Sequence, residues 1–397
     1  MARKYVLFIL DGCADYAIES LGNKTPLEAA AIPHLDRLAQ KGWTGLCTTT
    51  PKGMYTGSDN CCMGILGYNQ HQYYTGRGPL EAAAVGITLQ DSDVCFRCNT
   101  VNIKNDVMKD FTAGHITTEE SRQIILDLDD DLGSDDVRFY PGVSYRHLMV
   151  LKGRGAGVKC TPPHDITDKP VAAYLPKDHD DADYIIKIMK QAKPILENHA
   201  VNEHRVAAGE KPATDIWLWG QGTAVSLPKF QQLHGLKGAM ITAVDLLKGL
   251  ANLAGLTNID VPGATGFIDT DYAAKGRYAI EALKHNDFVC VHIEAPDESG
   301  HMGNAEFKRK SLEDIDAKIV GPVLEYLEKN EAYFRVLALP DHYTPCSLKT
   351  HSSEPVPFVI YGTGVTGNGA TAYTEKLVVQ NNLLSHGYDL MPKLLGN

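Results

Sequence analysis

The chain has 397 residues, of which 44% are hydrophobic and 22% charged, and its net charge at neutral pH is −11. This length is ample for a large core and more than one domain, and the composition is that of an ordinary globular protein. The negative charge argues against nucleic-acid binding, which needs clustered lysine and arginine, although a few local cations can still hold one phosphate. No segment approaches the ~20 apolar residues of a membrane helix.

The nine cysteines occur in a chain whose N-terminus has no secretory signal. We therefore expect reduced thiols and a cytoplasmic protein. Cys95 and Cys98 form a lone C-x-x-C pair without a second pair at zinc-finger spacing. A metal or redox role for this pair is therefore disfavoured.

Apolar runs that alternate with amphipathic segments predict an α/β fold. Tyr5–Leu10 is a continuous apolar run that ends in Asp11-Gly12, which is typical of a strand buried on both faces of a parallel sheet. Further strands are expected at 239–244, 288–293, 335–339 and 357–361, and helices at 33–41, 245–253, 272–283 and 307–327. This alternation predicts a mainly parallel sheet covered by helices.

Residues 77–212 mix short strands, charged helices and turn-rich links. We expect them to form an inserted, smaller α+β domain that binds or covers the substrate. The larger domain would then be discontinuous, formed by residues 1–76 and 213–397. The apolar run Ile216–Trp219 is interpreted as the return of the chain to this larger domain.

Ser58 lies between Gly57 and the apolar run 61–66, where a helix is expected to begin. A serine at a helix start is most often only an N-cap. The same position also favours a bound phosphate, because free N–H groups and the helix dipole meet there. No Ser-His-Asp arrangement is evident around Ser58 in the sequence.

Carboxylates and imidazoles follow several of the predicted strands. A single Asp or His at such a place is usually a cap or a surface residue, but here the carboxyl ends of several strands of one sheet carry them. Repelling carboxylates in one crevice indicate cations between them, and the mixed set suits Mn²⁺ or Zn²⁺ better than Ca²⁺. A coordinated serine hydroxyl can act as a nucleophile in such a site. The residues are Asp11, Asp297, His301, Asp341, His342 and His351.

The order of these motifs resembles the alkaline-phosphatase superfamily and, within it, the cofactor-independent phosphoglycerate mutases of the archaeal type. The resemblance runs nearly the full length of the chain. Its motifs are Asp11-Gly12, Thr56–Asp59, Ala295–His301, Asp341-His342 with Thr344-Pro345, and His351. It also takes in Arg77–Glu81, Phe96–Asn99, Ala113–Ile116 and Leu236–Gly238.

The resemblance implies two divalent metal ions, with Mn²⁺ preferred and Zn²⁺, Mg²⁺ or Co²⁺ as alternatives. One ion would bind Asp297, His301 and His351, and the other Asp11, Ser58, Asp341 and His342. Ser58 would form a phosphoserine intermediate. Lys237 stands where the family has a lysine near the nucleophile, and it is expected to serve both catalysis and substrate binding. His115, Arg97 and Arg146 are further candidates for holding the substrate.

The implied activity is the interconversion of 3-phosphoglycerate and 2-phosphoglycerate, a step of glycolysis and gluconeogenesis. The chain departs from the family at His115 and Tyr343, where members often have arginine and serine. These departures concern the substrate, so a homoserine kinase-like phosphotransferase and a metal-dependent phosphatase stay open as alternatives. Gly362–Gly367 matches a dinucleotide fingerprint, but Asn368-Gly369 follows at once, so a loop is expected there. No P-loop occurs, and the oligomeric state is left open.

Overall fold

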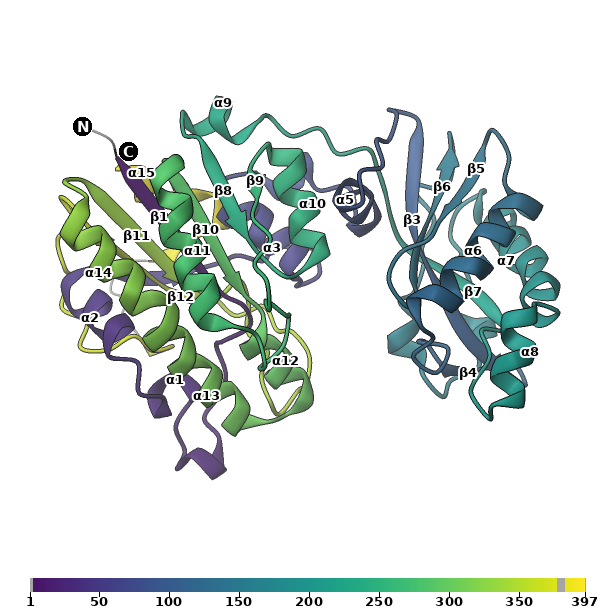
Figure 1. Ribbon diagram of the computed structural model, residues 1–397, viewed down its shortest axis with the longest axis horizontal. Helices are drawn as coiled ribbons and strands as arrows, with labels where there is room; N and C mark the ends of the chain where they lie inside the picture. The colour runs from purple at the N-terminus through teal and green to yellow at the C-terminus, as the bar shows by residue number, and fades with distance from the viewer. Residues whose placement is uncertain (1–2, 377–382, 397) are drawn as a thin grey trace. The chain divides into compact units, whose positions relative to one another are not determined.

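The computed structural model describes residues 3–376 and 383–396. Its backbone contacts divide the chain into two compact units, which are described separately (Figure 1). The first unit comprises residues 1–74 and 226–397, and the second comprises residues 75–225.

The first unit is built on an eight-stranded sheet with the strand order β13-β2-β12-β11-β1-β10-β8-β9. β1 lies between β10 and β11 and is parallel to both. Only β12 runs antiparallel to its neighbours, because residues 340–355 return the chain without a crossover helix. The strands are β1 (Lys4–Leu10), β2 (Trp43–Cys47), β8 (Gly238–Ile241), β9 (Thr257–Asn258), β10 (Phe288–Ile293), β11 (Phe334–Leu339), β12 (Val356–Gly362) and β13 (Leu383–Leu384).

Helices cover this sheet, and the central strand β1 is buried at every residue. One core packs Val6, Phe8 and Leu10 of β1 against the helices that lie across the sheet in Figure 1. The helices are α1 (Pro26–Ala29), α2 (Pro33–Lys41), α3 (Ser58–Ile65), α4 (Gln70–Tyr73), α9 (Phe230–His234), α10 (Asp245–Ala254), α11 (Tyr272–His285), α12 (Ala295–Met302), α13 (Ala305–Ile315), α14 (Gly321–Asn330) and α15 (Leu390–Leu395). The predicted mainly parallel sheet covered by helices is confirmed.

The helix predicted at 307–327 is a continuous segment in which a π-helical turn, Asp316–Val320, joins α13 to α14. The buried Asp316 in this turn accepts the backbone N–H groups of His34 (3.1 Å) and Leu35 (2.8 Å). Those groups belong to the first turn of α2, whose own N-cap, Ile32, has no capping side chain. The π turn thus supplies the missing cap from a distant part of the chain.

The second unit has a five-stranded sheet in which β3 pairs antiparallel with β4, β6 and β7. Helices α6 and α7 pack on the large apolar face of this sheet, whereas α5 lies on the other face. The elements are α5 (Arg77–Ala84), β3 (Asp93–Lys104), β4 (Val107–Asp110), α6 (Thr118–Leu132), β5 (Val137–Tyr140), β6 (Arg146–Lys152), α7 (Ala182–Glu197), α8 (Ala200–Ala207) and β7 (Asp215–Thr223).

The interpretation of Ile216–Trp219 as a return to the larger domain is wrong. These residues form the middle of β7, which pairs with β3 of the second unit from Val94 to Val101. An apolar run has the same local character in either sheet, and only its distant partner decides where it belongs. The second unit accordingly ends at residue 225 rather than 212.

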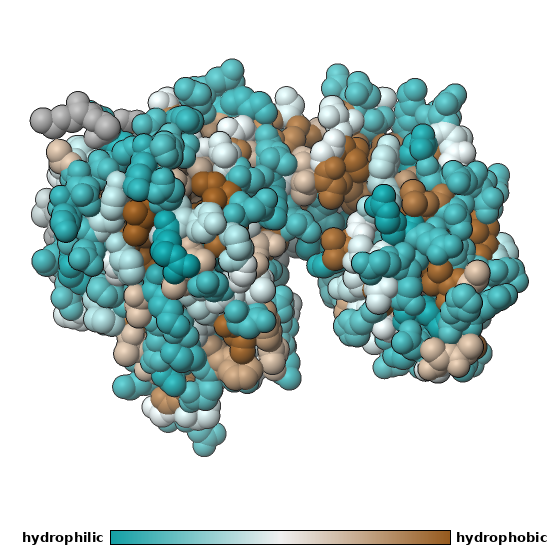
Figure 2. All heavy atoms as spheres, in the orientation of Figure 1, coloured by the Kyte–Doolittle hydropathy of each residue, from teal (hydrophilic) through white to brown (hydrophobic). Residues whose placement is uncertain are grey.

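Neither a helix opening directly after the dinucleotide-like segment nor a membrane-spanning helix is found among the described residues. After β12 ends at Gly362, no helix begins in the described residues up to 376, so the dinucleotide-like Gly362–Gly367 segment is a loop. Within residues 3–376 and 383–396, no helix is long and apolar enough to cross a membrane. Figure 2 shows a mostly hydrophilic surface on the face it presents, with apolar side chains in scattered patches.

Candidate metal and phosphoryl-transfer site

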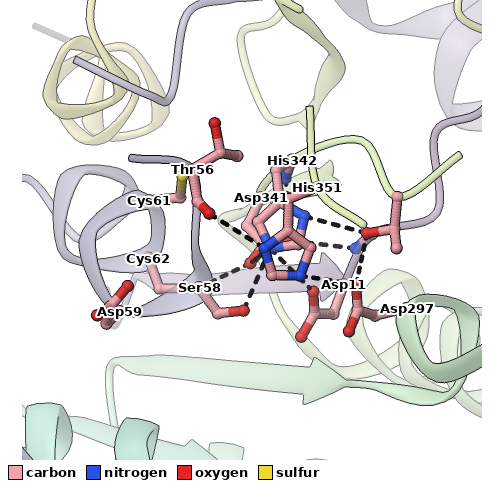
Figure 3. Close-up of polar contacts among 12 residues, drawn as sticks. Asp11, Thr56, Ser58, Asp59, Cys61, Cys62, Asp297, Asp341, His342 and His351 are labelled. Atoms are coloured by element: carbon pink, nitrogen blue, oxygen red, sulfur yellow. Dashed lines mark hydrogen bonds and ion pairs between the residues drawn. The ribbon is translucent and has the colours of Figure 1, made fainter. Parts of the chain in front are cut away.

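The site lies at the carboxyl edge of the first unit's sheet. Asp11 directly follows β1, Asp341 follows the neighbouring β11, and α12 begins directly after β10 on the other side. Because these three strands are adjacent and parallel, their carboxyl ends bring the polar side chains together. In Figure 3 Asp11, Asp297, His342 and His351 point toward one another.

Ser58 is the first residue of α3, and Gly57 is its N-cap residue. Its hydroxyl Oγ lies 3.2 Å from Nε2 of His342. The next residue, Asp59, is buried and accepts hydrogen bonds from the hydroxyl groups of Tyr55 and Tyr74. The predicted nucleophile therefore sits at a helix start, among polar groups from three segments.

Asp297 and His301, four residues apart on α12, lie on the same side of the helix as the sequence predicted. Nε2 of His301 lies 3.2 Å from Oδ2 of Asp297, and Nε2 of His351 lies 3.5 Å from Oδ1. The two Nε2 atoms are only 3.1 Å apart. Three ligand atoms thus converge on one point.

Backbone carbonyl groups set the protonation of these two imidazoles. Nδ1 of His301 lies 3.1 Å from the carbonyl oxygen of Lys349, and Nδ1 of His351 lies 3.0 Å from that of Thr56. A carbonyl oxygen only accepts, so each Nδ1 carries a proton, and in the neutral ring each Nε2 presents a lone pair. Two lone pairs that face each other beside a carboxylate are the arrangement that a metal ion satisfies.

His342 follows the same pattern. Its Nδ1 lies 3.3 Å from Oγ1 of Thr344, whose hydroxyl donates to Asp297 and therefore accepts from the imidazole. Its Nε2 is left to face Ser58, Oδ2 of Asp341 at 3.3 Å and Oδ1 of Asp11 at 3.7 Å. The sequence showed no Ser-His-Asp arrangement, but the fold does link Ser58 to Asp297 through His342 and Thr344.

The electrostatics of the site favour added positive charge. Burial raises the pKa of Asp11 well above its usual range, and the Asp341 and Asp297 carboxylates raise it further. Burial acts to raise the pKa of Asp297 also, but hydrogen bonds from His301 and His351 bring it well below its usual range. Burial acts to lower the pKa of His301, yet Asp297 raises it to about 9. A cation at the site would relieve the repulsion between carboxylates that helps to raise the pKa of Asp11.

Two sets of potential metal ligands have all their ligand atoms within 4.8 Å of one another. One is Asp297, His301 and His351, the same trio that the family resemblance implied. The other is Asp11, Asp297 and His342, so Asp297 takes part in both. Asp341 contacts His342 and also accepts the backbone N–H of Gly12 at 3.1 Å. No such set of ligands includes Cys95 or Cys98 among the described residues.

The expectation that Lys237 lies near Ser58 is wrong. Lys237 is exposed and precedes β8, and its backbone pairs with Asp287 at the amino end of β10. β8 is parallel to β10, whose carboxyl end leads into the site, so about seven residues or ~23 Å separate Lys237 from that edge. The expectation failed because the order of motifs in the sequence does not show which end of β8 lies at the site.

The second unit contains a separate group of cations. Arg97 of β3 is buried, with Nε 3.2 Å from Oε2 of Glu81, and Arg77 of α5 places Nε 2.8 Å from Oε1 of the same carboxylate. The Arg97 guanidinium lies 4.6 Å from the ring centre of Trp219. Burial lowers the pKa of Arg97 to about 10, with Glu81 opposing the shift and Arg77 and Arg146 adding to it. Three arginines around one carboxylate leave a net positive charge that suits an anion.

His115 is placed differently from these arginines. It lies in the turn between β4 and α6, with a positive φ of 51° and an exposed side chain. Its backbone N–H donates to Thr112 at 2.9 Å. Among the residues that the structure describes, no hydrogen bond or ion pair joins its side chain to Arg97 or Arg146.

Sequence reasoning missed several residues that shape the site. Thr344 was noted only as part of a motif, yet it bridges His342 and Asp297. His292, an imidazole inside the apolar strand β10, contacts Asp11 at 2.9 Å. Lys308 looks like one more charge on a surface helix but is fully buried against the loop after β1. A polar side chain within an apolar run is the only signal that would have found His292.

Known proteins are similar in sequence to this chain over nearly its whole length. The model of the 2,3-bisphosphoglycerate-independent phosphoglycerate mutase family matches residues 39–202. A protein of that name from Methanothrix thermoacetophila is 51% identical over 372 residues, which cover 94% of each chain. Another, from Methanosarcina acetivorans, is 48% identical over 379 residues and 95% of each chain. The chain belongs to the 2,3-bisphosphoglycerate-independent phosphoglycerate mutase family.

Solved structures agree with this membership. A Pyrococcus horikoshii protein matches with a TM-score of 0.84 and 30% identity, over 100% of this chain and 98% of its own. The cofactor-independent phosphoglycerate mutase of Thermoplasma acidophilum matches with a TM-score of 0.67 and 27% identity, over 99% of both chains. The family resemblance found in the sequence motifs is thereby confirmed.

Proposed function

We propose that this protein interconverts 3-phosphoglycerate and 2-phosphoglycerate through a phosphoserine on Ser58, with two divalent cations bound at the site. The observation that carries the proposal is the set of three imidazoles whose Nε2 lone pairs face buried carboxylates beside the Ser58 hydroxyl. Family membership supports the choice of substrate.

The residues fit the cations that the family resemblance implies. Asp297, His301 and His351 would hold one ion, and Asp11, Asp341, His342 and Ser58 would hold the other. Bound ions would lower the pKa of the Ser58 hydroxyl and neutralise charge on the phosphoryl group. The mixed nitrogen and oxygen donors suit Mn²⁺ or Zn²⁺.

In the first half-reaction, Ser58 Oγ attacks phosphorus and the bond from phosphorus to the substrate oxygen breaks. The proton lost by Ser58 ends on the oxygen that leaves, so phosphoserine and glycerate are formed. The neighbouring glycerate hydroxyl then attacks the phosphoserine and gives its proton back to Ser58. The start of α3 favours the phosphate during both steps, because its free N–H groups and dipole attract negative charge.

In this proposal, arginines of the second unit take part in substrate binding. Arg77, Arg97 and Arg146 surround Glu81, and Trp219 lies against two of them. A guanidinium can bind the glycerate carboxylate through two parallel hydrogen bonds. We expect Arg97→Met to raise KM for 3-phosphoglycerate about tenfold or more. The control is Arg138→Met, which removes an exposed arginine paired with Asp129 in the same unit and should leave KM unchanged.

The decisive experiment follows the phosphoryl group. Mn²⁺-loaded protein is mixed with ³²P-labelled 3-phosphoglycerate, quenched in acid and mapped by mass spectrometry, with Ser58→Ala and Ser311→Ala alongside. Ser311 is a matched control, because it is buried and its hydroxyl donates within α13 to the carbonyl oxygen of Lys308. We expect labelled Ser58 in the wild type and Ser311→Ala, and no label or turnover in Ser58→Ala.

Mutase turnover by folded, metal-loaded Ser58→Ala would rule out the phosphoserine route. Full activity after metal removal would instead assign activation of Ser58 to the His342–Thr344–Asp297 chain alone. Homoserine with ATP is assayed in parallel, since phosphorylation of homoserine without mutase activity would overturn the substrate. Release of inorganic phosphate alone would indicate a phosphatase.

A further inference from the structure

His292 is a fourth imidazole at the site, and its hydrogen bonds differ from those of the other three. It lies on β10 beside the ends of β1 and β8, with its side chain fully buried. Nδ1 lies 3.2 Å from Oγ1 of Thr242, and Nε2 lies 2.9 Å from Oδ2 of Asp11. These two contacts span the whole ring and leave neither nitrogen free.

Thr242 sets the direction of these hydrogen bonds. Its Oγ1 accepts the backbone N–H of Val244 at 3.1 Å, and its own hydroxyl proton has no other acceptor among the described residues. The hydroxyl therefore donates to Nδ1 of His292, which must be unprotonated. The proton of the neutral ring then sits on Nε2 and is donated to Oδ2 of Asp11. His301, His342 and His351 are protonated on the opposite nitrogen.

The two carboxylate oxygens of Asp11 therefore differ in their hydrogen bonding. Oδ2 is engaged by His292, whereas Oδ1 is buried without a hydrogen-bond partner in the described structure. Oδ1 faces Nε2 of His342 at 3.7 Å, and that nitrogen presents a lone pair. A carboxylate oxygen without a hydrogen-bond partner beside an imidazole lone pair needs a third, positively charged partner.

We propose that His292, held by Thr242, is a positioning residue that fixes the rotation of the Asp11 carboxylate. This rotation keeps Oδ1 directed toward the cation. The proposal rests on the metal site of the proposed function. It adds that His292, which carries its proton on Nε2 instead of Nδ1, binds the metal ligand Asp11 rather than the metal ion. A hydrophobic residue at 292 would suit the strand, but it would leave Oδ2 free to turn.

The first test determines directly which ring nitrogen of His292 carries the proton, and it needs no metal. Long-range ¹H–¹⁵N spectra of metal-free protein distinguish Nδ1–H from Nε2–H imidazoles, and His292→Gln assigns the signal. We expect Nε2–H at His292. A signal for Nδ1–H there would overturn the proposal, because Asp11 would then receive no proton from the ring.

The second test compares two variants of similar size. Glutamine carries an amide N–H at about the position of Nε2, whereas asparagine reaches only to Nδ1. We expect His292→Asn to weaken Mn²⁺ binding about 10–100-fold by calorimetry, and His292→Gln to stay within a few-fold of wild type. His147→Asn, at a buried imidazole of the second unit, is the control and should not change Mn²⁺ affinity.

A purely structural His292 would give equal losses of thermal stability in both variants with Mn²⁺ affinity unmoved, and this result would refute the proposal. If His292→Asn does not fold, the proton measurement on wild-type protein still decides. Wild-type protein that binds no Mn²⁺ would overturn the metal centre itself. In that case the His292 signal remains readable, so the two failures are distinguishable.

Discussion

Replacing Lys308 by methionine should destabilise the first unit by about 3–5 kcal/mol, the usual cost of leaving one member of a buried ion pair alone. The Lys308 side chain is fully buried, and its ammonium donates to Asp15 Oδ2 (2.9 Å), Ala14 O (3.2 Å) and Thr344 O (2.8 Å). All three protons are therefore used. The variant would leave the buried Asp15 carboxylate without its cation and would remove one donor from each of two carbonyl groups.

The matched control is Lys310→Met on the same helix. Lys310 is 60% exposed and pairs with Asp314 one turn on, so its loss should cost about 0.5 kcal/mol or less. Hydrogen exchange of metal-free protein, measured on β1 and β11 peptides, reports the opening free energy of this unit by itself. Equal effects of the two substitutions would refute the reasoning. The double variant Lys308→Met/Asp15→Asn should recover about half of the loss, because no buried charge remains.

Three further outcomes are expected. Gly12→Ala should abolish Mn²⁺ binding measured by calorimetry, because Gly12 has a φ of +57° and a Cβ would lie 2.4 Å from Thr344 Oγ1 and 2.9 Å from Asp297 Cα; unchanged affinity would contradict the crowding. Mn²⁺ affinity should rise about tenfold per pH unit from 6 to 8, because His301, with a pKa of about 9, must lose its proton to bind the ion; a flat profile would contradict this. Burial raises the pKa of Glu375 to about 7, so the folded state holds this proton more tightly than the unfolded state and stability falls as pH rises from ~4.5 to ~7. Denaturation curves of Glu375→Gln should lack this decline of about 1–3 kcal/mol.

The sequence by itself was enough to predict the elements that rest on local pattern. The run 288–293 is β10, and the amphipathic segment 33–41 is α2, because burial on one or both faces requires apolar residues at a fixed period. The convergence of the proposed metal ligands was also predictable, since residues that follow adjacent parallel strands meet at one edge. The turn of α12 that joins Asp297 and His301 was visible as a spacing of four.

Other features depended on partners far away in the chain. Ile216–Trp219 could have paired in either sheet, and Lys237 was misplaced because its motif does not show which end of β8 it occupies. Tertiary structure likewise decided that Lys308 is buried and that Thr344 lies between His342 and Asp297. Hydrophobic period acts within a few residues, whereas strand pairing and the hydrogen bonds of buried polar groups join segments up to hundreds of residues apart. The sequence alone therefore determined which side chains reach the sheet edge, and only the folded chain decided which nitrogen or oxygen of each one faces the site.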